Sequence, residues 1–431
     1  MNPFGRAMKV LREEGPQELG VRTGRAFVRY GRVIRSEGWR SYASRGFAKL
    51  SQLAAVHRPS MLVREEDALA ADWTRPGPQL ASPITVKSGP IDIAWIMSPP
   101  GKESGGHQNL FRFIRYAEDA GHRCTIYLYD ARTENSISIP DVRAMLAASE
   151  AFPDLKAEIR NYSAEGVHSS AQAIFATGWE TAYPAFLDKS TARRLYFVQD
   201  FEASFYPLGS ESLLAENTYR FGFYGITAGG WLSDKLAREY GMKTAHFDFA
   251  VDAERYHLTN TGRRNEIFFY ARPVTARRAF EFGALALGDF ARLRPDVTIN
   301  LAGWDVSNWP LPFEYVNHSS LELSQLNKLY NRCAAGLVMS LSNMSLLPLE
   351  LISAGVAPVV NDGPNNRLVS DNPFIEYVPA SPRAVADRLV EVLERPDQPE
   401  RAVAMSQSVS NTDWRESGKQ FVEALERAMR G

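Results

Sequence analysis

The stretch GLVMSLSNMSLLPLELISAGVAPVVN, residues 336–361, decides the fold class of this chain. Its first apolar run, 336–341, predicts a buried strand, and a polar turn over 342–345 follows. A helical pattern at 347–354 ends at a glycine, and the apolar run 357–360 predicts a second strand. A strand, a loop, a helix and another strand in this order are typical of an α/β protein with a parallel sheet.

One carboxylate, Glu350, lies inside the otherwise apolar helical pattern of this stretch. A charge among apolar residues needs a partner, and a ligand is a good candidate because ligands bind at the carboxyl ends of parallel strands. Ser345, Leu346 and Leu347, at the helix start, offer backbone N–H groups to a phosphate. Glu350 follows one turn later and can accept two sugar hydroxyls. The alternative is a carboxylate that only caps the helix or pairs within the protein.

The same order of strands, loops and helices repeats on both sides and predicts two α/β halves. The second half begins after the polar linker TNTGRRN at 259–265, and a hinge is expected within 251–265. The expected strands are 91–97, 123–130, 173–177, 195–199, 223–227 and 246–249, then 266–270, 297–302, 336–341, 357–361 and 376–378. The main expected helices are 108–121 and 231–239, then 276–293, 323–332, 347–354, 382–394 and 413–429.

Composition places the chain among globular proteins. It has 431 residues and a net charge of −1, so no general attraction to nucleic acid is expected. No run approaches the roughly 20 apolar residues of a membrane span, and the N-terminus lacks a signal-peptide core. Cys124 and Cys333 lie in apolar contexts and are expected to be reduced and buried, which suits a cytoplasmic protein.

Residues 1–50 are unusually basic, with eleven Lys or Arg and four Glu interleaved with apolar residues. This pattern indicates basic amphipathic helices. They form either a solvated extension packed on the body or a surface that docks on anionic lipid headgroups. The second interpretation would place the protein at the inner face of a membrane.

The first half carries a glycine loop between its first strand and first helix. Gly105 and Gly106 let backbone amides approach a ligand closely, and His107 follows at the helix start. The loop is not GxGxxG, so a dinucleotide-binding enzyme is not favoured. The alternative is a glycine turn that only connects two elements.

Polar and aromatic residues follow the strand 195–199 of the first half. Gln199, Asp200 and Glu202 come at its carboxyl end, where side chains face the expected cleft. Tyr206 and the neighbouring phenylalanines can form a wall for a sugar ring, or they can simply belong to the core.

Three arginines follow the first strand of the second half, in YARPVTARRAF. Arg272, Arg277 and Arg278 lie where the strand passes into a helix. Planar guanidinium groups suit a diphosphate. Cations at the first turn of a helix oppose its dipole, which favours an anion site over plain surface charge.

The loop after strand 297–302 is the expected neighbourhood of a nucleotide base. Gly303, Asn317 and His318 mark it, with backbone groups and apolar contacts expected to hold the base. His318 has no second His or Cys at ligand spacing, and no DxD, Walker loop or HExxH occurs. The sequence therefore predicts no metal site and no cofactor.

Over residues 91–431 these segments resemble the retaining GT-B glycosyltransferases of family 4. The segment SLLPLELISAGVAPVVND (345–362) carries the resemblance, in which Glu350 matches the acid that contacts the nucleotide ribose. Ser342 stands where the family has another Glu. Arg272 with Arg277 or Arg278 resembles the family's Arg and Lys diphosphate pair, and Gln199–Asp200 stands where the family has His-Asp.

Four further segments are similar to the WsaF-type rhamnosyltransferases, which use dTDP-L-rhamnose to build surface glycans. They are YFVQDFE with FYPLGS (196–210), ITAGGWL (226–232), FYARP (269–273) and SLSNMSLLPLE (340–350). The resemblance implies two Rossmann-like domains facing across a cleft, with a nucleotide-sugar donor and a saccharide or lipid-linked glycan acceptor. The alternatives are a UDP- or GDP-sugar donor and a GT-B-like binding module without turnover.

The resemblance also divides the chain and assigns roles. It implies a basic extension and linker (1–90), an acceptor domain (91–255), a donor domain (256–410) and a C-terminal helix (411–431) packing back on the acceptor domain. The implied donor-binding residues are Arg272, Arg277, Arg278, Gly303, Asn317, His318, Ser345, Leu346, Leu347 and Glu350. The implied catalytic residues are Gln199, Asp200, Gly105 and Gly106, and the implied acceptor-binding residues are His107, Glu202 and Tyr206.

Overall fold

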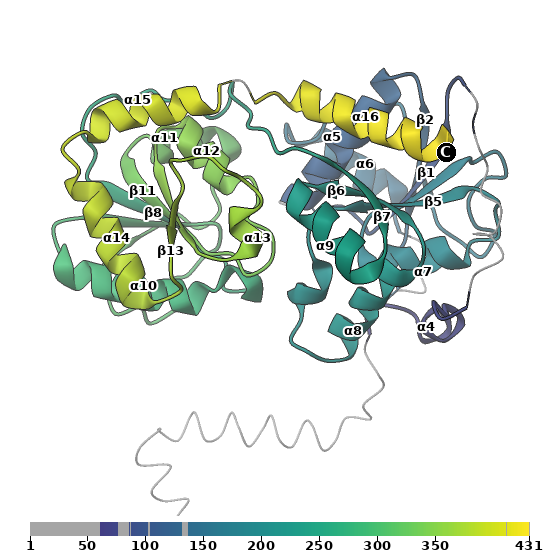
Figure 1. Ribbon diagram of the computed structural model, residues 1–431, viewed down its shortest axis with the longest axis horizontal. Coiled ribbons are helices and arrows are strands. Elements are labelled where there is room, and N and C mark those ends of the chain that lie inside the picture. The colour runs from purple at the N-terminus through teal and green to yellow at the C-terminus, as the bar shows by residue number, and fades with distance from the viewer. Residues whose placement is uncertain are drawn as a thin grey trace, which may run out of the picture. The chain divides into compact units, whose positions relative to one another are not determined.

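The computed structural model describes residues 61–75, 86, 88–101, 104–131, 137–410 and 412–430 (Figure 1). The basic segment 1–50, with its predicted amphipathic helices, lies outside the described residues. The predicted linker contains a short helix, α4 (Glu65–Ala70). Tyr129 Oη ties this helix to the body by donating a hydrogen bond to Asp67 Oδ2 at 2.9 Å. None of the described helices is long and apolar enough to cross a membrane.

The first domain is built on a seven-stranded sheet in the order β3-β2-β1-β4-β5-β6-β7, and neighbouring strands are parallel. Its central strands are continuous apolar runs because helices cover both faces of the sheet. The strands are β1 (Asp92–Met97), β2 (Arg123–Leu128), β3 (Glu158–Asn161), β4 (Ala173–Ala176), β5 (Arg193–Val198), β6 (Tyr224–Ala228) and β7 (Lys243–Phe247).

The second domain is built on a six-stranded sheet in the order β10-β9-β8-β11-β12-β13, also parallel. The two parallel sheets confirm the predicted α/β class. The strands are β8 (Glu266–Tyr270), β9 (Thr298–Ala302), β10 (Val316–Asn317), β11 (Cys333–Val338), β12 (Ala357–Asn361) and β13 (Glu376–Val378).

The helices connect these strands and cover the sheets. The first domain has α5 (Gly105–Asp119), α6 (Ile139–Ala147), α7 (Trp179–Leu187), η2 (Glu202–Phe205), α8 (Ser210–Asn217), η3 (Thr218–Arg220) and α9 (Gly230–Tyr240). The second has η4 (Ala276–Arg278), α10 (Phe280–Leu293), α11 (Leu323–Tyr330), α12 (Leu347–Ser353), α13 (Pro364–Arg367), α14 (Pro382–Glu394) and α15 (Gln398–Ser408).

Two helix starts differ from the sequence prediction, and both lie at the candidate site. Helix α5 begins at Gly105 rather than near residue 108, because the Ser104 side chain caps it by accepting from the His107 N–H. Helix α10 begins at Phe280 rather than at 276, because Ala279 has φ 44° and breaks the helix after η4.

The last helix, α16 (Trp414–Arg430), packs on α5 and β7 of the first domain, as Figure 1 shows in yellow. Phe421 is fully buried there, and its ring centroid lies 6.1 Å from that of Trp95 and 5.2 Å from that of Phe113. A Cβ at Gly418 would lie 2.7 Å from the Tyr116 ring, so only glycine allows this close approach of α16 to α5. The chain therefore passes between the two domains twice, between β7 and β8 and between α15 and α16.

Candidate active site

A cavity of about 1020 Å³ opens where the carboxyl ends of strands from both sheets come together. Strands β1, β4 and β5 contribute its wall in the first domain, and β8, β9 and α12 contribute the opposite wall. All the predicted site residues except Asn317 and His318 line it. These are Gly105, Gly106, His107, Gln199, Asp200, Glu202, Tyr206, Arg272, Arg277, Arg278, Gly303, Ser345, Leu346, Leu347 and Glu350.

Asn317 and His318 lie outside the lining because each is held by its neighbours at the sheet edge. Asn317 Nδ2 donates to Asp305 Oδ1 at 2.7 Å, and His318 Nε2 lies 2.8 Å from Asn300 Oδ1. The chain reaches the cavity only after them, at residues 320–324. The sequence did not predict that Asn317 and His318 precede the lining residues, because β10 is only two residues long and has no periodic pattern.

The three arginines lie on the second-domain wall but differ in their surroundings. Arg272 Nη1 donates to Gly303 O at 3.4 Å, and Arg278 Nη1 donates to Asn343 O at 3.5 Å. Burial lowers the pKa of Arg278, although a guanidinium stays protonated in proteins. Arg277 stacks on Phe205 at 3.9 Å, and its buried Nε has no hydrogen-bond partner among the residues that the structure describes. This wall therefore presents cations whose hydrogen-bond donors are incompletely used.

Asp200 lies at the carboxyl end of β5 and joins the two domains. It accepts a hydrogen bond from Ser342 Oγ at 3.0 Å, and Arg277 Nε lies 3.4 Å from the same oxygen. Asn343 Nδ2 donates to Gln199 O at 3.0 Å beside it. Burial raises the pKa of Asp200, while Arg277, Arg278 and the Ser342 hydroxyl lower it. Sequence reasoning placed Asp200 and Ser342 in separate roles, and the structure brings them into contact.

The Gln199 side chain is held within the first domain, beside the glycines of the loop. Its Nε2 donates to Gly106 O at 3.0 Å, and its Oε1 accepts from Asn109 Nδ2 at 3.1 Å. A Cβ at Gly106 would lie 3.7 Å from Gln199 Nε2, and nothing lies within 4 Å of a Cβ at Gly105. The helix start therefore stays open toward the cavity at Gly105.

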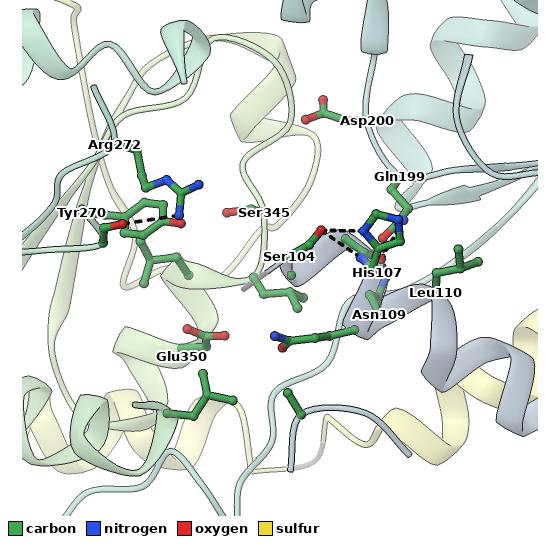
Figure 2. A pocket seen from close by; sticks show the side chains of 18 of the residues that line it. Ser104, His107, Asn109, Leu110, Gln199, Asp200, Tyr270, Arg272, Ser345 and Glu350 are labelled. Atoms are coloured by element: carbon green, nitrogen blue, oxygen red, sulfur yellow. Dashed lines mark hydrogen bonds between the residues drawn. The ribbon is translucent and has the colours of Figure 1, made fainter. Parts of the chain in front are cut away.

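Glu350 is half-buried on the second-domain wall, across open space from His107 and Gln199 (Figure 2). Burial raises the pKa of Glu350 to about 7, against the opposing effect of Arg255 and Arg112, and Asp252 adds to the rise. These three residues also line the cavity. Sequence reasoning missed them because Arg112 belongs to an ordinary amphipathic helix and the other two lie in a connection without a motif.

The predicted acceptor residues of the first domain are mostly engaged with the protein. His107 Nδ1 lies 2.8 Å from Ser104 Oγ and Nε2 lies 3.2 Å from Ser98 O, as the dashed lines to Ser104 in Figure 2 indicate. Burial lowers the pKa of His107, so the ring is neutral near pH 7. Tyr206 Oη accepts from Trp179 Nε1 at 3.0 Å. These contacts fix the shape of this wall.

The two facing α/β domains and the cavity at their strand ends define a GT-B glycosyltransferase fold. Solved structures share it: S. aureus TarM, crystallised with fondaparinux, α-GlcNAc-glycerol and UDP, aligns with a TM-score of 0.62 at 7% identity, covering 79% of this chain and 100% of that chain. HepE from Anabaena in complex with UDP-glucose aligns with a TM-score of 0.58 at 11% identity, covering 78% and 100%.

Sequence comparison gives the family. The family model for the WsaF N-terminal domain matches residues 157–227, and the one for the WsaF C-terminal domain matches 265–390. Segments of this chain thus match both domains of the WsaF family. It is also 32% identical over 288 residues to the O-antigen biosynthesis protein RfbC of Myxococcus xanthus, which covers 65% of this chain and 22% of RfbC. The chain thus spans about a fifth of the length of that relative.

Proposed function

We propose that this protein transfers L-rhamnose from dTDP-L-rhamnose, with retention of configuration, to a saccharide or lipid-linked glycan acceptor. The observation that carries the proposal is the second-domain wall, which combines incompletely bonded arginines with Glu350 across from the strand ends of the first domain. The match to both WsaF domains supports the choice of donor, because the WsaF-type enzymes that the sequence resembles use dTDP-L-rhamnose.

In this mechanism Arg272, Arg277 and Arg278 bind the diphosphate and stabilise the charge that builds on it as the sugar departs. Arg277 Nε lies 3.4 Å from Asp200 Oδ2 but makes no hydrogen bond to a described residue, so a phosphate oxygen can satisfy this donor. Glu350 accepts hydrogen bonds from the nucleotide sugar hydroxyls. We expect no metal requirement, since these fixed cations supply the charge that a metal would otherwise bring.

The transfer itself needs no covalent intermediate with the protein. The bond between the sugar C1 and the diphosphate oxygen breaks, and the acceptor oxygen bonds C1 on the same face. The acceptor proton moves to the departing diphosphate. Closure of the two domains would keep water away from the reacting carbon, which disfavours hydrolysis.

A different donor base is the main alternative, motivated by the UDP and UDP-glucose in the structures of the similarly folded TarM and HepE. A binding module without turnover is the other, motivated by Ser342 and Gln199 at positions where the family has Glu and His.

A donor panel read by thermal shift and by transfer separates these possibilities. At one hundred times its Kd, dTDP-L-rhamnose should raise the free energy of unfolding by about 2.7 kcal/mol over that of the ligand-free protein. We expect UDP- and GDP-sugars to stabilise the protein less. Incubation with labelled dTDP-L-rhamnose and a rhamnosylated acceptor should then give labelled product. Donor binding without transfer or hydrolysis, across several acceptors, would contradict the enzyme proposal.

We also propose that residues 1–50 hold the protein at the cytoplasmic face of a membrane, because their arginines and lysines suit anionic headgroups. Sedimentation with phosphatidylglycerol vesicles checks this. The full chain should cosediment at low salt, and a chain lacking residues 1–50 should stay in the supernatant. Equal sedimentation of the two would contradict it.

A further inference from the structure

The first-domain wall carries a carboxylate that none of the assigned roles uses. Glu180 lies in the first turn of α7, just after the carboxyl end of β4, and it lines the cavity. A carboxylate at this position is favoured by the N-terminal end of the helix dipole. Ser98 Oγ, at the end of β1, donates to Glu180 Oε1 at 2.6 Å and fixes the orientation of the group. Its other oxygen, Oε2, accepts no hydrogen bond from the residues that the structure describes.

The neighbouring acid, Glu202, does not compete for a ligand. It is 6% exposed, and its Oε2 accepts from Trp179 N at 2.5 Å and from Tyr196 Oη at 3.1 Å. Burial, followed by the charge of Glu180, raises the pKa of Glu202 well above its usual range. Glu202 is therefore engaged within the protein, and the half-buried Glu180 is the carboxylate that faces a ligand in this part of the cavity.

Aromatic side chains complete the wall beside Glu180. The Tyr206 ring is half-exposed in the cavity, with its hydroxyl held by Trp179 Nε1. Phe205 comes next and carries the Arg277 guanidinium over its ring at 3.9 Å. A carboxylate can accept hydrogen bonds from the hydroxyl groups of a pyranose ring. An aromatic face can pack against the C–H groups of the same ring. The Phe205–Arg277 contact places this surface directly beside the proposed diphosphate clamp.

We propose that Glu180, oriented by Ser98 and flanked by Tyr206, binds a pair of neighbouring hydroxyls on the acceptor sugar. The acceptor is then a pyranoside with an unsubstituted vicinal diol next to the hydroxyl that is glycosylated. This inference rests on the proposed function, since it assigns the acceptor side of the same cavity.

The substitution Glu180→Gln tests the proposal, because it keeps the shape of the side chain and removes its charge. We expect the KM for a rhamnose-terminated oligosaccharide to rise about tenfold to a hundredfold, the range for a hydrogen bond to a charged group. The Kd for dTDP-L-rhamnose and its slow hydrolysis should stay within twofold of the wild type. Glu180→Asp, which keeps the charge, should recover part of the loss. Glu211→Gln, on α8 and outside the cavity lining, is the matched control and should change neither constant.

Equilibrium binding separates this inference from the proposed function. Methyl α-L-rhamnopyranoside and its 2,3-di-O-methyl derivative are compared by saturation-transfer NMR on the nucleotide-bound full chain. Binding of the diol only, lost in Glu180→Gln with an unchanged melting temperature, supports the subsite even if no transfer occurs. An unchanged acceptor KM in Glu180→Gln, or equal binding of the two glycosides, or no binding of either, overturns it. Failure of the donor to bind would contradict the proposed function instead.

Discussion

Among single residues, we expect Glu350 to make donor binding depend on pH. Its pKa is raised to about 7, so it loses its proton as the pH rises through that value. If the carboxylate accepts donor hydroxyls, affinity is highest above pH 7 and falls about tenfold from its plateau at pH 6, where only about a tenth of the group is ionised. Calorimetric titration of dTDP-L-rhamnose between pH 6 and 8.5 measures this slope.

The control for this pH dependence of donor affinity is Glu350→Gln, which cannot titrate and should bind dTDP-L-rhamnose weakly at every pH. Arg112, Arg255 and Asp252 face the same carboxylate, so the ionic strength is held constant throughout. A slope that persists in Glu350→Gln would assign the titration to another group.

Arg272 is expected to discriminate between a diphosphate and a nucleoside. Arg272→Ala should weaken dTDP binding by about tenfold or more, because a charge-assisted hydrogen bond contributes roughly 1.5–3 kcal/mol. Thymidine binding should change little. The matched control is Arg292→Ala on α10, which lies outside the cavity lining. Equal weakening of dTDP and thymidine would argue against a diphosphate clamp.

Side chains near a strand end were predictable from sequence, and their partners were not. Ligands bind at the carboxyl ends of parallel strands, and this rule placed Arg272 and Gln199 at the cavity because each lies at the end of an apolar run that predicts a strand. It says nothing about contacts across the cavity, so the Ser342–Asp200 hydrogen bond and the Glu180–Ser98 pair, which is 82 residues apart in sequence, emerged only from the structure.

At the level of elements, α16 contributes the Phe421 ring to the core of the first domain. Phe421→Ala should lower the free energy of unfolding by about 3–5 kcal/mol, because the ring is fully buried among other aromatic rings. Glu423→Ala, on the exposed face of the same helix, should change it by less than about 0.5 kcal/mol. Urea unfolding of both variants measures the difference, and similar values would mean that α16 is not held by this core.

The sequence predicted the central strands and missed the edge strands β3 and β10 for a physical reason. Central strands such as β8 and β12 are buried on both faces and therefore read as uninterrupted apolar runs. Strand β3 is an edge strand with one buried residue, and β10 has two residues. Neither is therefore marked in the sequence by an apolar run or by alternating apolar and polar residues. Helix boundaries shifted where a cap or a left-handed residue intervened, at Ser104 and Ala279.

At the scale of the whole molecule, Asp200, Ser342 and Asn343 hold the two domains together at one end of the cavity. The double variant Ser342→Ala with Asn343→Ala removes two of these hydrogen bonds and leaves Asp200 with Arg277. We expect the ligand-free variant to have a larger radius of gyration in solution scattering, and saturating dTDP-L-rhamnose to return it to the wild-type value. Identical scattering of variant and wild type without ligand would show that these contacts do not hold the domains together.

Because α16 packs back on the first domain, the order of synthesis also determines when each domain can complete its fold. A ribosome makes β1 through β7 first, yet their core still lacks Phe421 until the second domain has been translated. The second domain is continuous in sequence and can fold while the first still waits. A nascent chain halted between the two crossings would expose an aromatic groove beside α5, which is a surface for chaperones and proteases to recognise. Packing of α16 on α5 and β7 completes this core.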